Sequence, residues 1–298
     1  HEGASILMQY SNDTSTVKFG VKAAAYNDVM DARLLGKDSV SGKGDWKYLW
    51  SPVVIYSWNK DGQNLTLEYS NVTAPVSSLH RMPTPDISNQ RQITTGNVYL
   101  KSGLSNNVMA YYNLVNYSTF TFLTIYANAE VQNNGTVYAN WFDTSGCRYS
   151  VPVNARKPGT SANAYAILNQ PFGKKKSFTL TLSAQMNMDS RISYQAESVQ
   201  KRLDLNSFDY NAFMDELWGD ESGSRFYNGE SGFIEGRTNY LNCGFGSDIK
   251  YSKGIFSGSL SAGAFNGWSS FSLNRNANLD VWDYNVRGNI LLQPNKGW

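Results

Sequence analysis

An unbroken alternation of apolar and polar residues at positions 178–188 constrains this chain most. The apolar positions are Phe178, Leu180, Leu182, Ala184, Met186 and Met188. A period of two is the pattern of a β-strand with one apolar and one polar face. Strands of soluble domains usually end after about five or six residues, whereas a tilted strand that crosses a bilayer needs about 9–11. The length of this pattern therefore favours a membrane strand, which follows a tight basic turn at residues 173–176.

Composition narrows the class of protein without deciding it. Charged residues make up 17% of the 298 residues, against about 25% in an ordinary soluble protein. Aromatic residues make up 14%, which fits either a β-sandwich core or two aromatic girdles at membrane interfaces. The net charge of +2, without a basic stripe, argues against a nucleic-acid partner. No apolar run reaches the roughly 18 residues that a transmembrane helix needs.

The same alternation predicts about eleven strands along the chain. Asp61 and Gly62 give one hairpin a strong turn signal. Residues 136–142 and 148–153 are expected to form a short extra hairpin, and residues 208–218 a short helix. Residues 28–47, 71–107 and 197–237 are expected to be loops. The expected strands are 5–10, 16–27, 52–59, 64–69, 108–116, 119–131, 162–171, 178–194, 238–251, 255–265 and 280–293.

The connections between these strands alternate in length. Short ones lie near residues 12, 61, 117, 174, 253 and 295, and long ones near residues 35, 90, 145, 215 and 273. This alternation is typical of short periplasmic turns and long extracellular loops in an outer-membrane barrel. We therefore expect an all-β fold, an antiparallel transmembrane β-barrel, with residues 1–298 forming a single barrel domain.

Several motifs follow one another in an order that a known family shares. PVVIYSW at 52–58 and NLTLEYS at 64–70 are followed by GNVYLKSG at 96–103, FGK at 172–174, LNR at 273–275, WDY at 282–284 and PNKGW at 294–298. The series resembles the Bacteroidetes outer-membrane β-barrel proteins, which are related to TonB-dependent receptors. Gly96, Asn97 and Leu100 match that family's G-N-P-x-L-x-P-E segment. Val98 stands in place of its first proline, and Ser102 and Gly103 replace Pro-Glu.

The resemblance implies a barrel of about 22 strands, the size of the largest plugged transporters. The chain then looks like a slice of a larger protein, without the N-terminal plug and the final strands. The implied function is binding and import of a bulky nutrient at the cell surface. The implied partners are outer-membrane lipid, a TonB-type energising complex acting through the missing plug, and a surface lipoprotein. The implied location is the outer membrane of a Gram-negative cell.

The residues themselves indicate no catalytic chemistry. Neither His1 nor His80 has a Ser or Cys partner at a recognisable spacing, and we expect no enzyme, cofactor or metal site. The acidic residues of 209–221 lack the spacing of an EF-hand and are expected to form a solvated loop. Cys147 and Cys243 are expected to be two separate thiols, although the sequence leaves a disulfide open.

Two sets of side chains are candidates for ligand contact. Loop aromatics are expected to capture an oligosaccharide or a peptide at the cell surface; they are Trp46, Tyr48, Trp141, Phe142, Trp218, Phe226, Tyr227 and Trp268. Polar strand residues either line a solute path or only hydrate the barrel wall and pack against a plug; they are Lys18, Lys22, Thr66, Glu68, Thr179, Thr181, Gln185 and Arg287.

Two other functions stay open at this point. The first is a structural or adhesive outer-membrane barrel through which nothing passes; a plug with a TonB box upstream in the gene would favour transport instead. The second is a soluble β-sandwich that binds carbohydrate, which predicts solubility without detergent and strands of about six residues.

Overall fold

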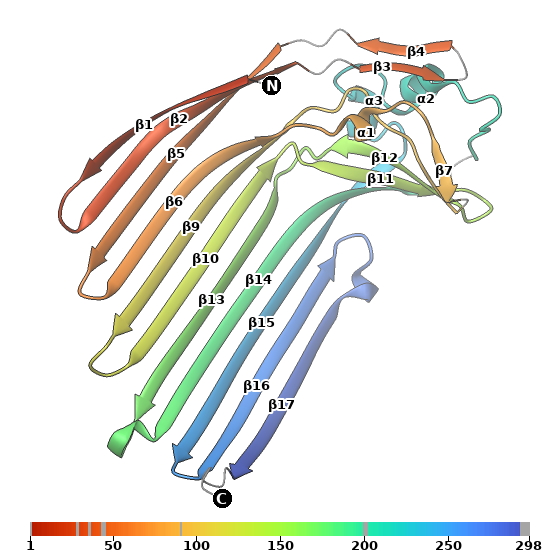
Figure 1. Ribbon diagram of the computed structural model, residues 1–298. Coiled ribbons are helices and arrows are strands. Elements are labelled where there is room, and N and C mark those ends of the chain that lie inside the picture. The colour runs from red at the N-terminus through yellow and green to blue at the C-terminus, as the bar shows by residue number, and fades with distance from the viewer. Residues whose placement is uncertain are drawn as a thin grey trace, which may run out of the picture.

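One large mixed sheet, which is not closed, dominates the molecule (Figure 1). The computed structural model describes residues 2–27, 30–34, 37–42, 46–89, 91–198 and 202–292, and within them the chain is mostly β-strand. Eleven strands form an antiparallel meander, as the sequence predicts. In order they are β1 (Glu2–Ser11), β2 (Ser15–Asn27), β5 (Trp46–Lys60), β6 (Gln63–Ala74), β9 (Gly103–Asn116), β10 (Thr121–Asn133), β13 (Gly159–Phe172), β14 (Phe178–Ala196), β15 (Phe233–Lys253), β16 (Phe256–Phe271) and β17 (Leu279–Leu292).

The strands of the meander are long, from 10 residues in β1 to 21 in β15. Their register places the alternating apolar residues of all eleven strands on one side, which we call the apolar face. For example, Ala164 pairs with Met186, Met186 pairs with Cys243, and Leu180 pairs with Ile249. The opposite side, the polar face, carries the residues between them. The period of two in the sequence is thus realised as one continuous two-sided sheet.

The short connections all lie at one end of the meander, and the long ones lie at the other (Figure 1). The Asp61–Gly62 turn has φ values of 51° and 76°, the left-handed pair of a two-residue hairpin turn that follows the twist of the strands. Gly62 is required there, because an added Cβ would lie 2.3 Å from the Val115 carbonyl oxygen. The predicted separation of short and long connections is confirmed, except near residue 295, which lies outside the described residues.

The long connections after β6, β10 and β14 fold together into a cap, residues 75–102, 134–158 and 202–232. The cap contains α1 (Ser78–Arg81), β7 (Asp86–Asn89), β8 (Gln92–Thr94), β11 (Thr136–Phe142), β12 (Arg148–Asn154), α2 (Tyr210–Leu217) and α3 (Ser224–Tyr227). The predicted extra hairpin and short helix are confirmed as β11–β12 and α2. The expectation of a purely antiparallel sheet is wrong here: β11 pairs in parallel with the upper part of β14, and β12 pairs in parallel with β8.

Three predicted loops contain more structure than expected. Within residues 28–47, β3 (Met30–Leu34) and β4 (Lys37–Gly42) form a separate two-stranded sheet. Residues 71–107 include the end of β6, α1, β7 and β8. In the third predicted loop, residues 197–237, β15 already begins at Phe233 rather than at Thr238. These segments lack a regular period of two, so that hydrogen bonding between neighbouring segments, rather than hydrophobic patterning, defines them.

The meander ends in two open edges. Within the described residues, β1 pairs only with β2, and β17 pairs only with β16. An open edge presents unpaired backbone N–H and C=O groups. Additional strands, or other hydrogen-bond partners, are therefore required along β1 and β17 if the sheet is to lie in an apolar medium.

Candidate functional site

The hydrophobic core of the described residues lies in the cap and at the adjoining ends of β14 and β15, where the long connections begin. Trp141 on β11 stacks on Tyr149 of β12, with ring centroids 5.3 Å apart. Phe233 meets Trp141 edge-on at 6.0 Å, and Phe213 of α2 lies 6.1 Å away. Three aromatic rings therefore surround the indole, and Trp141 is only 4% exposed.

A second aromatic group fixes α3 to the sheet. Trp218 stacks on Phe226 at 5.3 Å, and both side chains are buried. Tyr194 of β14 meets Phe226 edge-on at 5.1 Å, and the Tyr227 hydroxyl donates a hydrogen bond to the Asn154 carbonyl oxygen. Because stacking of a sugar ring requires an exposed aromatic face, these rings serve the cap as core residues.

The aromatics proposed from the sequence as ligand contacts thus have three kinds of environment. Trp141, Trp218 and Phe226 are buried in the cap, and Tyr227 is half-buried beneath the Arg156 guanidinium, whose carbon lies 4.4 Å from the ring centre. Phe142 is exposed at the end of β11. Trp268 lies within β16 on the apolar face, not in a loop. Trp46 and Tyr48 begin β5, and their side chains lie outside the described residues.

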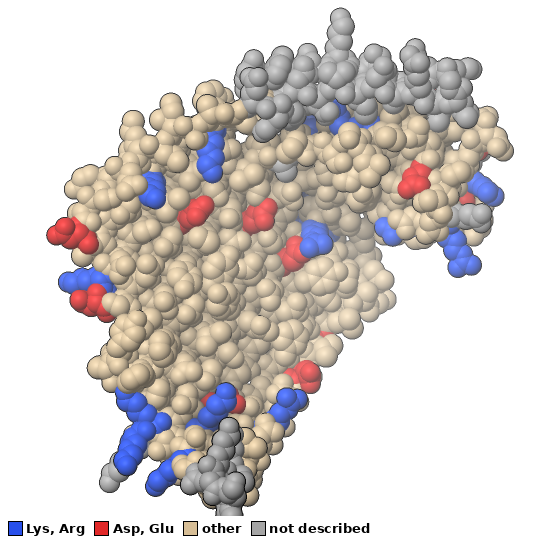
Figure 2. All heavy atoms as spheres, in the orientation of Figure 1, with Lys and Arg blue, Asp and Glu red and all other residues tan. Residues whose placement is uncertain are grey.

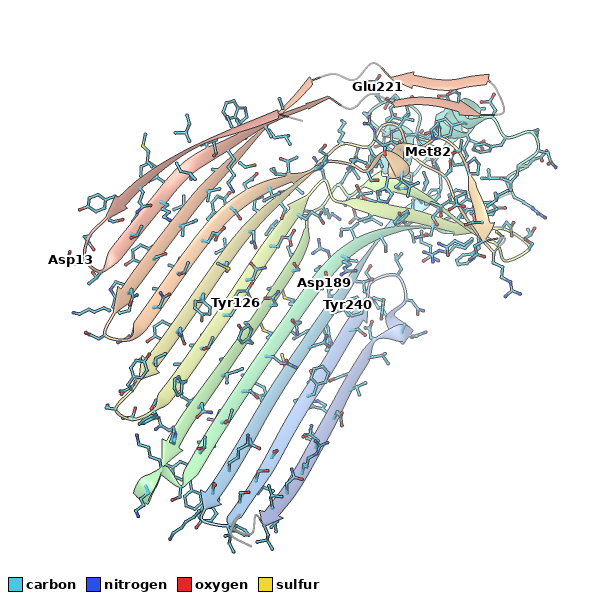
Figure 3. The ribbon with its side chains drawn as sticks, viewed as in Figure 1. Asp13, Met82, Tyr126, Asp189, Glu221 and Tyr240 are labelled. Carbon is cyan, nitrogen blue, oxygen red and sulfur yellow. The ribbon has the colours of Figure 1, made fainter. Side chains whose placement is uncertain are left out.

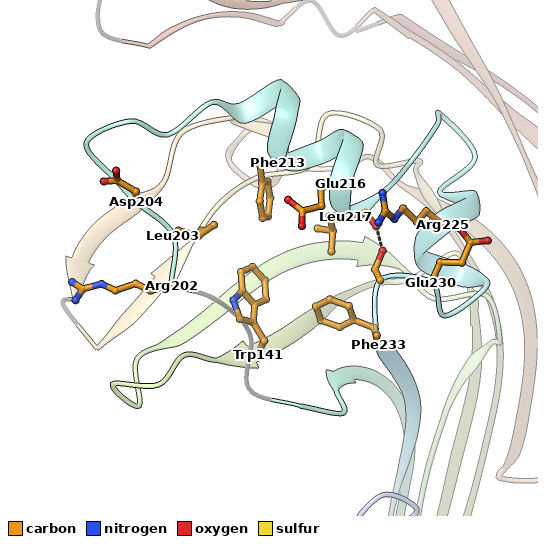
Figure 4. A pocket seen from close by; sticks show the side chains of 12 residues that line it. Trp141, Arg202, Leu203, Asp204, Phe213, Glu216, Leu217, Arg225, Glu230 and Phe233 are labelled. Atoms are coloured by element: carbon orange, nitrogen blue, oxygen red, sulfur yellow. Dashed lines mark hydrogen bonds between the residues drawn. The ribbon is translucent and has the colours of Figure 1, made fainter.

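A groove of 530 Å³ crosses the cap (Figure 4). Its floor is apolar, with Trp141, Phe213 and Phe233 close together. Arg202 and Asp204 stand at one end and Arg225 and Glu230 at the other, while the Glu216 carboxylate lies beside Phe213 (Figure 4). The groove therefore offers charges of both signs over a short apolar floor.

The segment at 96–103, on which the sequence resemblance rests, helps to build the cap. Gly96 is packed so closely that an added Cβ would lie 2.1 Å from the Met82 carbonyl oxygen. Asn97 and Leu100 are fully buried or nearly so. The Tyr210 hydroxyl donates to the Gly96 carbonyl oxygen at 3.3 Å and accepts from the Val98 N–H at 3.2 Å. This segment therefore anchors α2 to the rim of the sheet.

Two carboxylates of the cap, Asp209 and Asp220, hold the backbone of their own segments. The Asp209 side chain accepts from the N–H groups of Asn211 and Ala212 and caps α2. Asp220 accepts from the N–H and hydroxyl of Ser222, and these bonds, with those from Ser224, lower the pKa of Asp220 to about 2. In the part of the chain that the structure describes, no group of three or more His, Cys, Asp or Glu residues is placed to hold a metal ion.

Asp143 closes the turn between β11 and β12. Its carboxylate accepts from the Ser145 hydroxyl at 2.6 Å, the Cys147 N–H at 3.0 Å and the Tyr149 hydroxyl at 3.1 Å. The Ser145 hydroxyl in particular holds the pKa of Asp143 below its ordinary value. Burial, together with the Asp143 carboxylate, raises the pKa of Tyr149 to about 12. Cys147 and Cys243 are not joined to each other.

The polar face of the meander carries the second predicted set of residues. The register places all of Lys18, Lys22, Thr66, Glu68, Thr179, Thr181, Gln185 and Arg287 on this one face. Acidic and basic side chains are scattered over it (Figure 2). Three of its residues, Tyr126, Asp189 and Tyr240, are labelled in Figure 3. Whether this face lines a solute path stays a prediction.

Two cross-strand rows on the polar face are not apparent from the sequence. Asn128, Asn163, Asn187 and Asn242 lie side by side on β10, β13, β14 and β15. In the next row Tyr111, Tyr126 and Tyr165 are neighbours, and the last two rings stack at 5.3 Å. The residues of each row are far apart in sequence and become neighbours only through the strand register, so that alternation alone does not reveal them.

Comparison with known proteins identifies no family for this chain. No protein-family model matches the chain, and no curated protein matches it. None of the described helices has the length and apolarity to cross a membrane.

Proposed function

We propose that this chain forms part of the wall of an outer-membrane β-barrel. The observation that carries the proposal is the exposed apolar face, which extends over eleven long strands. Its side chains include Ile6, Val54, Phe245, Val286 and Ile290, which are 73%, 44%, 64%, 76% and 76% exposed. Contiguous apolar surface of this extent is not kept in water by monomeric soluble proteins. Lipid chains are the solvent that such a face fits.

The distribution of charge agrees with a bilayer. Five charged residues within the strands, Lys18, Glu68, Glu130, Asp189 and Asp248, lie on the polar face, whereas Lys253 and Asp280 on the apolar side stand at strand ends. Barrel strands in membranes alternate in this way, with apolar residues toward lipid and polar residues toward the interior. The lengths of β5, β14 and β15 also exceed the roughly 9–11 residues that a crossing requires.

The soluble β-sandwich is less well supported. A sandwich buries its apolar face against a second sheet about 10 Å away. Within the described residues no second sheet covers the apolar face, and the buried core belongs to the cap instead.

We further propose that the intact barrel is TonB-dependent-receptor-like and imports a bulky nutrient. The support is the family resemblance together with the placement of its motif: Gly96, Asn97 and Leu100 fix the cap at the long-loop end of the polar face. A folded cap with a groove at this end would meet a ligand before it reached the polar face.

The barrel proposal is tested by fractionating cells that carry the full-length gene and running the membrane pellet on a gel with and without boiling. We expect a band that needs detergent for extraction and shifts on heating. A soluble protein with no heat shift would contradict the proposal. Nutrient import is tested separately, by comparing uptake in cells with and without a functional TonB-type complex.

A further inference from the structure

An aromatic band borders the apolar face at its short-turn end. Phe172 stacks on Phe178 with centroids 5.3 Å apart, Phe178 lies 4.7 Å from Tyr251, and Tyr251 lies 5.9 Å from Phe256. The four rings come from β13, β14, β15 and β16, and the register places all of them on the apolar face. Aromatic rings in this position are typical of the boundary between hydrocarbon and head groups.

Lysines stand immediately beyond this band. Lys175 and Lys176 lie in the turn between β13 and β14, and Lys253 ends β15 beside Phe256. The Lys176 ammonium lies 3.4 Å from the centre of the Phe120 ring and donates to the Ser118 carbonyl oxygen at 3.1 Å. This lysine therefore joins two neighbouring turns and keeps its charge at the rim of the sheet.

Two of these ammonium groups are available for an external anion. Lys175 and Lys253 are exposed, and neither takes part in an ion pair within the described residues. Lys175 and Lys176 also adopt left-handed backbone conformations, with φ of 61° and 52°. Such conformations are costly for residues other than glycine and gather at functional sites. The segments 170–178 and 250–258 contain no Asp or Glu.

We propose that the short-turn end of β13–β16 binds the head groups of anionic phospholipids. The aromatic band would lie at the level of the glycerol backbone, and Lys175 and Lys253 would pair with lipid phosphates just outside it. Juxtamembrane lysines attract anionic lipid, by an amount that corresponds to about five-fold in affinity for each lysine near the surface. The inference rests on the proposed function, because it requires the apolar face to lie in a bilayer.

The test uses the full-length gene product, purified in detergent and reconstituted into phosphatidylcholine vesicles containing a trace of spin-labelled lipid. The fraction of label immobilised by the protein is compared between phosphatidylglycerol and phosphatidylcholine labels. We expect phosphatidylglycerol to be preferred, and the preference to fall at high salt, because exposed charges are screened.

Matched variants locate the preference. Lys175→Gln combined with Lys253→Gln removes two charges at the short-turn end and should reduce the preference by about five-fold for each lysine. Lys101→Gln removes one exposed charge in the cap and should leave the preference unchanged. An equal loss in both proteins would overturn the assignment to this end of the sheet.

The two proposals fail in different ways. If the protein inserts into phosphatidylcholine vesicles and shifts on heating, but retains both labels equally, the head-group site is wrong and the barrel stands. If it inserts into neither phosphatidylcholine vesicles nor vesicles of phosphatidylcholine and phosphatidylglycerol in equal parts, the proposed function itself is wrong.

Discussion

At the residue scale, the cap depends on a few positions at which a larger side chain does not fit. Gly96 has ordinary backbone geometry, but its Cα faces the Met82 backbone so closely that any side chain would collide with it. Tyr210 reaches the same segment with both hydrogen bonds of its hydroxyl. The Gly-Asn pair recognised in the sequence is thus explained by packing rather than by ligand chemistry.

Gly96→Ala should destabilise the cap by about 1–3 kcal/mol, the usual cost of overpacking a closely packed site. The measurement is thermal unfolding in detergent, followed by the near-ultraviolet circular dichroism of the buried cap aromatics. Gly159→Ala is the control, because its added Cβ would meet only the Ser190 carbonyl oxygen at an ordinary 3.5 Å. Equal melting temperatures for the two variants would show that the cap is looser than the structure indicates.

Asp143→Asn should destabilise the β11–β12 turn by about 1–3 kcal/mol, because hydrogen bonds to a charged acceptor are lost. The native carboxyl has a pKa below its ordinary value of 3.8. Its contribution to the free energy of unfolding is therefore present above that value and is lost as the pH falls below it. The native cap should weaken as the pH falls below 3.8, and the Asn variant should lack this component. Parallel pH profiles of the two proteins would contradict the assignment.

At the scale of the element, β14 shows what the alternation encodes. Met186 and Gln185 are sequence neighbours, yet they project to opposite faces, where Met186 pairs with Cys243 and Gln185 with Gly244. A single strand therefore belongs to two different environments. The length of β14 also lets its last residues extend beyond β13 and pair with β11 on that side, while they stay paired with β15 on the other.

Met186→Arg should destabilise the inserted protein by about 2–4 kcal/mol, the cost of a basic residue on the lipid face near the bilayer midplane. Gln185→Arg introduces the same side chain one residue away, on the polar face, and should be tolerated. The readout is the fraction of heat-shifted band after refolding into vesicles at increasing urea. Comparable losses in both variants would mean that the two faces do not differ in their solvent.

At the scale of the whole molecule, the two ends of the meander differ. Asp13 lies in a short turn, and Glu221 lies in the cap at the opposite end (Figure 3). In the proposed orientation the cap faces the outside of the cell and the short turns face the periplasm.

A membrane-impermeant maleimide should therefore label Glu221→Cys on intact cells, and should label Asp13→Cys only after the outer membrane is disrupted. Both substitutions are made in a background in which Cys147 and Cys243 are replaced by serine. Labelling of Asp13→Cys on intact cells, with Glu221→Cys protected, would reverse the orientation.

The sequence by itself determined the meander. Period-two alternation, the Asp61–Gly62 turn signal and the unequal connections are local properties, and they located eleven strands and the end of the molecule where the long loops gather. Hydrophobic patterning is sufficient for this, because each strand carries its own two faces.

Only the tertiary structure decided what the cap aromatics do and which residues meet on the polar face. Trp141, Trp218 and Phe226 look like surface contacts in a polar loop sequence, but long-range packing between β11, β14, α2 and α3 buries them. The row of Asn128, Asn163, Asn187 and Asn242 exists only because four strands pair in one register. Contacts between distant segments depend on chain closure and register, which no local pattern specifies.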